Sequence, residues 1–173
     1  WYSFLTQDFL DSYKYSKKWV NLFEKHPKMI TINPVFYLKG NHYLLESLFL
    51  IKHHTSFKKV LHQLETAISS GKVPKNSNTE ALIFLYCDTN KLNLHFLEGS
   101  FREGLHLVPE IEERIVCYNK QLDEHHIMIF YYKIACLYFG AANNVKCIEY
   151  LNKIIENKDL EMREDLLCFA RVL

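Results

Sequence analysis

The sequence predicts an all-α fold built from antiparallel helical hairpins, and three observations support this prediction. Apolar residues recur at helical spacing, as at Tyr131, Ile134, Ala135 and Tyr138, which occupy positions i, i+3, i+4 and i+7. The 173 residues include only five glycines and four prolines, against twelve phenylalanines and eleven tyrosines. One helical pattern also recurs at a nearly constant interval. Together these features favour long helices with few irregular connections.

The clearest hairpin spans residues 131–155. Gly140 is expected to adopt the left-handed backbone conformation that ends the first helix, and the asparagines that follow are candidate N-caps of the second. Ala135 and Cys147 are small, so they are expected where the two helices approach most closely. The apolar stripe predicted for the second helix consists of Cys147, Ile148, Leu151, Ile154 and Ile155.

The second-helix pattern recurs upstream of Cys147. Its equivalent positions are Lys18, Val60 and Gly104, which gives intervals of 42, 44 and 43 residues. The first copy is the weakest, because Lys18 stands where a small residue is expected. A near-constant period is typical of a solenoid, in which each hairpin buries its apolar face against its neighbours. We therefore expect one domain over residues 1–173, with about four hairpins and part of a fifth.

One known helical repeat has large or small residues at fixed positions. The last hairpin fills these positions in order, with Tyr131, Ile134, Ala135, Tyr138, Cys147, Leu151 and Ile154. This pattern resembles the tetratricopeptide repeat. Asn144 stands where that family usually has an aromatic residue, and Asp159 replaces its closing proline. The resemblance implies a right-handed α-solenoid.

Local signals place the individual helices. Asn33 and Pro34 mark a helix start, with the helix running to about Ile51 or His53. The partner helix is expected to open at Phe57 and to continue to Ser69, before a loop over residues 69–78. Ser77 and Glu80 fit a capping box that begins a helix ending near Glu98. Pro109 predicts a kink in the helix that contains it, and Asp123 and Asp159 are the expected N-caps of two further helices.

Composition limits the classes of function. A formal net charge of +1 gives no overall field for nucleic acid or an anionic membrane, and the lysines at 14, 17, 18, 58 and 59 are interpreted as solvated helix faces. The apolar run at 127–132 is closed by Lys133 and is too short to cross a bilayer. Five cysteines without a CxxC pair predict reduced core thiols. Since the sequence shows neither a signal peptide nor an apolar run that could cross a bilayer, a cytoplasmic location is expected. Because the chain starts at Trp1 and stops inside an expected helix, we expect a fragment of a longer protein.

No residue pattern predicts catalysis, a cofactor or a metal site. Nine histidines include the adjacent pairs His53-His54 and His125-His126, but neighbouring side chains on a helix point about 100° apart, which disfavours a shared ion. The cysteines have no visible base partner, and glycine-rich phosphate loops are absent from the sequence. The expected function is therefore non-enzymatic.

The resemblance also implies where a partner binds, since the first helices of tetratricopeptide repeats line a concave groove. Some members of that family clamp a peptide carboxylate with polar and basic residues at fixed positions. In this sequence only Asn90 and Lys133 are suitable at those positions, so an amphipathic helix or peptide is the expected partner. The groove residues carried over are His42, Leu45, Phe49, Lys52, His53, Tyr86, Asn93, Phe96, Ile129, Tyr132, Cys136 and Phe139.

Three alternatives stay open beside a protein or peptide interaction module. The groove can be covered by another segment of the same protein. The chain can be a peptide-sensing regulatory domain coupled to an effector domain that is not in the sequence. The third alternative, a histidine-based metal site or enzyme, has the least support.

Overall fold

The computed structural model describes residues 6, 8–157, 168 and 170–172. These residues form helices and turns without a β-strand, which confirms the predicted all-α class. The chain divides into two compact units, Trp1–Leu97 and Glu98–Leu173, called unit 1 and unit 2 below. Successive hairpins of a solenoid also contact mainly their neighbours, so this division leaves the single-domain prediction open.

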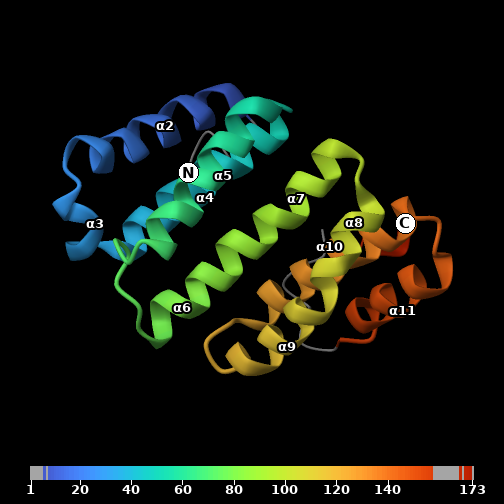
Figure 1. Ribbon diagram of the computed structural model, residues 1–173. Coiled ribbons are helices and arrows are strands. Elements are labelled where there is room, and N and C mark those ends of the chain that lie inside the picture. The colour runs from blue at the N-terminus through green and yellow to red at the C-terminus, as the bar shows by residue number, and fades with distance from the viewer. Residues whose placement is uncertain (1–5, 7, 158–167, 169, 173) are drawn as a thin grey trace. The chain divides into compact units, whose positions relative to one another are not determined.

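Unit 1 is built around α4, against which α2, α5 and α6 all pack. Helices α4 and α5 form a hairpin joined by a short turn, as Figure 1 shows. In chain order, the elements of unit 1 are α2 (Phe9–Lys25), α3 (Lys28–Ile32), α4 (Pro34–Leu50), α5 (His54–Ser69), α6 (Ser77–Ile83), the π-helical segment η1 (Phe84–Asp88) and α7 (Thr89–Glu98).

The core of unit 1 is supplied by the apolar sides of α4 and α5. Leu38, Leu45 and Leu48 of α4 are fully buried, as are Phe57 and Leu64 of α5. Burying a side chain of this size contributes about 1.5–3 kcal/mol, so these five residues outweigh any single polar contact in the unit.

Unit 2 is built around α10, which packs against both α8 and α11. Phe130 and Ile134 of α10 and Ile154 of α11 are fully buried, and Ala135 and Cys147 are buried as predicted. The elements of unit 2 are α8 (Phe101–Gly104), the 3-10 turn η2 (Leu105–Leu107), α9 (Val108–Tyr118), α10 (Glu124–Gly140) and α11 (Asn144–Ile155).

Most predicted helix boundaries are confirmed. Asn33 occupies the N-cap of α4 with Pro34 at the first helical position, and α5 ends at Ser69. The predicted start of α5 at Phe57 is wrong, because this helix begins at His54. Asp123 is the N-cap residue of α10. Near Pro109 the expected kink takes the form of the 3-10 turn η2, and the proline lies in the first turn of the new helix α9, where its missing N–H costs nothing.

The predicted capping box of α6 is wrong by one residue. Asn76, not Ser77, is the N-cap: its side-chain Oδ1 accepts a hydrogen bond from the N–H of Thr79 at 3.0 Å. Thr79 Oγ1 in turn accepts from the N–H of Asn76 at 2.8 Å, so the box closes with threonine in place of Glu80. Threonine can do this because its hydroxyl reaches back over one turn.

The role predicted for Gly140 is also wrong. Gly140 belongs to α10, and the left-handed residue of the turn is Ala142, at φ 60°. A Cβ at position 140 would lie 2.5 Å from Cγ of Phe101, so the glycine is needed for close packing of that ring against α10. Asn143 caps α11 as expected, because its Oδ1 accepts from the N–H of Lys146 at 3.2 Å.

The apolar stripe of α11 is rotated from its predicted position. Ile148 and Ile155 are exposed, whereas Tyr150, which was not in the predicted stripe, is buried. The buried residues Cys147, Tyr150, Leu151 and Ile154 have the spacing i, i+3, i+4 and i+7 that one helix face requires.

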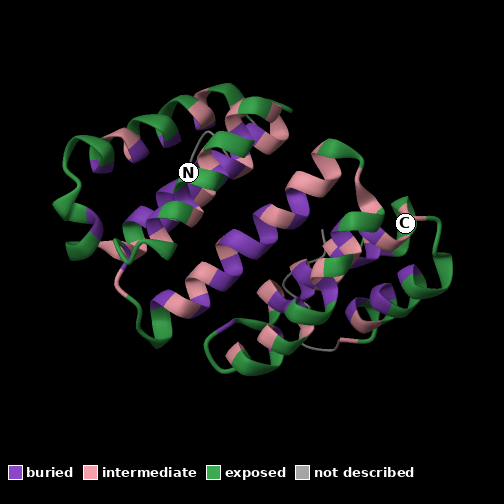
Figure 2. Ribbon diagram, in the orientation of Figure 1, coloured by how far each residue is buried: buried purple, intermediate pink, exposed green. Residues whose placement is uncertain are grey.

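Burial is uneven along the chain, as Figure 2 shows. From Thr79 to Leu97 every residue is buried or half-buried, and this stretch includes the buried polar residues Asn90 and Asn93. The predicted N-cap at Asp159 lies outside the described residues, as does most of the helix expected to follow it.

Candidate binding surface

The twelve residues expected to line a groove divide between the two units. In unit 1, Leu45 is fully buried within the core cluster, so its predicted place in a groove is wrong. It lies beside Leu44 and Leu48 on the face of α4 that forms this core. Phe49, Phe96, His42 and Tyr86 are half-buried, whereas Lys52 and His53 are exposed in the turn between α4 and α5.

Asn93 is likewise buried, in a polar network that joins α4 to α7. Its Nδ2 donates hydrogen bonds to Glu46 Oε1 at 3.0 Å and to Asn90 Oδ1 at 3.2 Å. Asn90 Nδ2 donates to the Tyr86 carbonyl at 2.7 Å and lies 3.3 Å from Nδ1 of His42. The rings of His42 and Tyr86 stack, with 4.4 Å between centroids. Since buried amides need such partners, the network fixes the register of the two helices, and the predicted groove position of Asn93 is wrong.

In unit 2, the four groove residues Ile129, Tyr132, Cys136 and Phe139 lie on one side of α10, at the spacing of a helix face. Phe139 is exposed and the other three are half-buried. Burial raises the pKa of Tyr132 to about 12, and its neighbour Cys136 adds to the shift, so this phenol is neutral at physiological pH. A single groove formed by residues of both units stays a prediction.

A pocket that the sequence did not indicate lies in unit 1, where α2 ends and α4 begins. Its volume is about 870 Å³. The rings of Trp19 and Phe36 lie 6.4 Å apart beside it. The lining residues define what we call the α2–α3 pocket: Trp19, Leu22, Phe23, Lys25, His26, Pro27, Lys28, Met29, Asn33 and Phe36.

Large apolar side chains are exposed around this pocket. Leu22 is 59% exposed, Phe36 is 56% exposed and Met29 is 38% exposed. Ile32, which precedes the pocket residue Asn33, is also exposed. An apolar patch around a hollow is unusual on a protein surface unless something binds there. The signal in the sequence is the run Met29–Ile32, three apolar residues in four, just before the helix start at Asn33 and Pro34.

The charged residues at the α2–α3 pocket have one sign. Lys25 and Lys28 belong to its lining, together with His26, and the described lining includes no carboxylate. Trp19 can lie against α4 because position 40 is glycine, where an added Cβ would come within 3.1 Å of the indole Nε1. The pocket therefore combines an aromatic wall with a basic rim.

A second groove of about 770 Å³ lies between α2 and α5. Tyr37 and Asn41 of α4 form part of it, and Lys17 of α2 and Lys59 of α5 contribute positive charge beside one carboxylate, Glu24. Two of the lysine clusters of the sequence thus converge on one groove. Burial raises the pKa of Tyr37, so its hydroxyl stays protonated.

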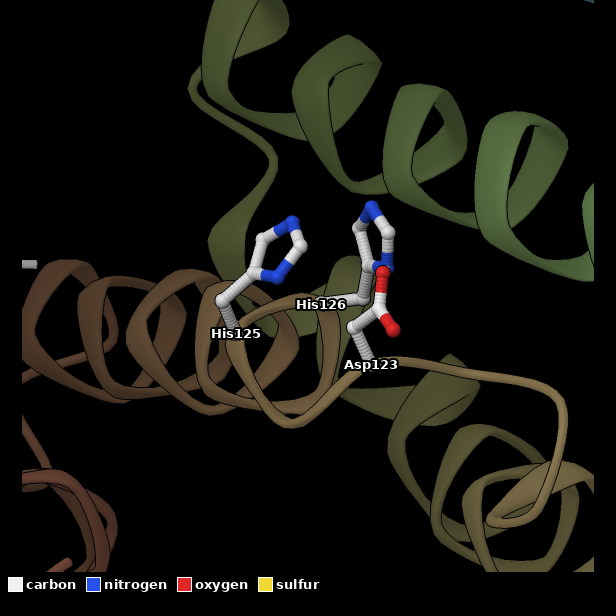
Figure 3. Close-up of side chains that lie close together, drawn as sticks. All are labelled: Asp123, His125 and His126. Carbon is white, nitrogen blue, oxygen red and sulfur yellow. The ribbon is translucent and has the colours of Figure 1, made fainter. Parts of the chain in front are cut away.

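A group of potential metal ligands lies at the start of α10. Asp123, His125 and His126 each offer one ligand atom, and these atoms lie within 4.8 Å of one another. The two imidazole rings are only 3.9 Å apart, so the expectation that adjacent histidines point away from each other is wrong here. Figure 3 shows the Asp123 carboxylate beside the ring of His126, with His125 next to it.

Two of the buried or half-buried cysteines are poor candidates for a nucleophile. Burial raises the pKa of Cys136 and of Cys147, which keeps both thiols protonated and poorly nucleophilic. The prediction of five core thiols is wrong for Cys117 and Cys168, which are exposed.

Comparisons with known protein families, with curated proteins and with solved structures find no match to this chain. Among the described helices, none is both long enough and apolar enough to cross a bilayer.

Proposed function

We propose that this chain is a tetratricopeptide-like protein-interaction module, and that its α2–α3 pocket binds an amphipathic helix with acidic residues beside its apolar anchors. The observation that carries the proposal is the pocket itself, in which exposed Leu22 and Phe36 surround a hollow of about 870 Å³. Pockets of about 300–1,000 Å³ are typical of binding sites in proteins.

The apolar lining supports a helical partner. An amphipathic helix presents anchors at i, i+3 and i+7 that fill an apolar groove, and its remaining surface stays in water. Phe36 and Trp19 supply the flat aromatic surfaces that dominate binding energy at many interfaces. A hollow of this kind fits side chains that project from a partner, whereas a bilayer surface is engaged by side chains that project from the protein.

The rim supports acidic residues on that partner. Lys25 and Lys28 are exposed, and the described pocket lining has no carboxylate to neutralise them. Opposite charges across an interface raise the association rate and select against basic partners.

A recurring turn supports the repeat part of the proposal. In the α4–α5 turn Lys52 is left-handed, at φ 55°, and the N–H of His53 donates to the carbonyl of Leu48. In the α10–α11 turn Ala142 takes the same role, and the N–H of Asn143 donates to the Tyr138 carbonyl. Two hairpins from different units therefore close by the same backbone geometry, as repeated units do.

A defined peptide tests the binding site. An 18-residue helical peptide with leucines at i, i+3 and i+7 and glutamates beside them is titrated into the full chain. In a Trp1→Phe background, the fluorescence of Trp19 reports directly from the pocket, because the chain has two tryptophans. We expect saturable binding, weakened at least about tenfold by Phe36→Ala and by the pair Lys25→Glu and Lys28→Glu.

Leu10→Ala provides the matched control, since Leu10 is an exposed apolar residue of α2 that does not line the pocket. It should leave affinity unchanged. A peptide with lysine in place of glutamate should bind more weakly. Equal binding of the two peptides, or full affinity of the Phe36→Ala variant, contradicts the proposal. Binding to phosphatidylserine vesicles without binding to the peptide assigns the pocket to membranes instead.

A further inference from the structure

We propose that Asp123, His125 and His126 bind one divalent transition-metal ion of the zinc, nickel and copper group. This site is independent of the α2–α3 pocket, since all three residues belong to unit 2. Two imidazole nitrogens and one carboxylate oxygen form a donor set that suits these ions, whereas calcium and magnesium prefer oxygen ligands alone.

The distances are close to those that a single ion requires. Bonds from zinc to nitrogen or oxygen are about 2.0–2.2 Å, so two ligand atoms on one tetrahedral ion are about 3.4 Å apart. Nδ1 of His126 lies 3.8 Å from Oδ2 of Asp123, slightly farther apart than this. All three ligand atoms lie within 4.8 Å of one another, so side-chain movements of roughly 1–1.5 Å bring them onto one ion.

The backbone holds the three residues in place without the ion. Asp123 is the N-cap of α10, and its carbonyl accepts a hydrogen bond from the N–H of His126 at 2.9 Å. The residues that follow, Ile127 and Met128, are buried and fix the first turn of the helix on its neighbours. A site whose ligands are positioned beforehand loses less conformational entropy when the ion binds.

Exposure and charge permit an ion to enter. Asp123 is exposed and both histidines are half-buried, so the carboxylate is open to solvent while Nδ1 of His126 itself is buried. The N-terminus of a helix carries a partial positive charge that opposes a cation, and the carboxylates of Asp123 and Glu124 offset it. Three protein ligands leave at least one coordination position for water, the arrangement of an open rather than a closed zinc site.

The test is a titration of the untagged, EDTA-treated full chain with zinc by calorimetry, and with cobalt by visible absorption. We expect one ion per chain and cobalt bands typical of mixed nitrogen and oxygen ligation. His125→Ala, His126→Ala and Asp123→Asn should each weaken binding by at least about tenfold. Asparagine is as good an N-cap as aspartate, so Asp123→Asn removes a ligand while the helix start is retained.

The adjacent pair at the α4–α5 turn provides the control. A variant with His53→Ala and His54→Ala removes two neighbouring histidines outside the cluster, and it should bind zinc as the wild type does. Circular dichroism checks that each variant is folded. The proposal is overturned if the wild type binds no stoichiometric zinc or cobalt, if Asp123→Asn binds as tightly as the wild type, or if the control variant loses the ion.

Discussion

Gly140→Ala tests the packing that holds unit 2 together. An added Cβ would lie 2.5 Å from Cγ of Phe101 and 2.6 and 2.8 Å from its two Cδ atoms. Carbon atoms in contact are normally about 3.5–4.0 Å apart, so the methyl group overlaps the ring by about 1 Å. These are the inner atoms of the ring, and they move only if the whole side chain or α8 moves.

The expected free-energy change combines two opposing effects. Forcing an extra methyl group into a packed site costs about 1–3 kcal/mol. Alanine is preferred over glycine within a helix by up to about 1 kcal/mol, and Gly140 is the last residue of α10, where this gain is smaller. We therefore expect Gly140→Ala to lower the free energy of unfolding by about 1–2 kcal/mol, which lowers Tm by about 2–4 °C per kcal/mol in a chain of this size.

Urea unfolding followed by circular dichroism at 222 nm measures the change. Phe101→Ala removes the ring, so Gly140→Ala should cost nothing in that background, and the double-mutant cycle should give a coupling of about 1–2 kcal/mol. Ala142→Gly is the contrasting variant: Ala142 has a left-handed backbone, so glycine should stabilise the protein by about 0.5–1 kcal/mol. A coupling near zero, or a Gly140→Ala protein as stable as the wild type, would refute the packing argument.

Three further predictions concern stability. Phe57→Ala empties a fully buried site in unit 1 and should cost about 3–5 kcal/mol in urea unfolding; a loss below 1 kcal/mol contradicts the assigned core. Lys91→Met removes the ammonium that lies 2.9 Å from the buried Asp88 carboxylate. We expect the free energy of unfolding to fall by about 1–3 kcal/mol, which is less than for a fully buried pair because the Lys91 side chain is 35% exposed. Adding Asp88→Asn should cost little more stability. Burial and the hydrogen bond to Glu112 raise the pKa of Tyr150 above its ordinary value of 10, so the stability it contributes is complete below pH 10 and declines as the pH rises beyond it. Tyr150→Phe should therefore show a smaller loss of stability between pH 9 and pH 11 than the wild type does, and an unchanged loss excludes this residue as its source.

The two proposed sites differ in how far they depend on folding. The metal ligands lie within four consecutive residues, so a local backbone turn brings them together. The α2–α3 pocket combines residues of α2, α3 and α4, and it exists only when α2 packs on α4. Its binding should therefore disappear with the unfolding of unit 1, whereas zinc affinity should follow the integrity of α10.

Local sequence determined the helical class and most helix ends. Apolar spacing and the Asn33-Pro34 start signal depend on residues within one or two turns, so they can be interpreted without knowledge of the fold. The burial of Ala135 and Cys147 also followed from local pattern, because small residues at helical spacing mark a close contact.

Tertiary structure alone decided which residues face a partner and which face the core. In the sequence Gly140 resembles a turn glycine, but in the fold it makes room for the ring of Phe101, which is distant in sequence. Leu45 became a core residue because α4 packs on several helices at once. The α2–α3 pocket arises where the ends of several helices meet. The apolar periodicity of a sequence describes one helix at a time, so it could not predict this pocket. Such sites depend on how helices approach each other, which is set by the sum of many packing contacts rather than by any local pattern.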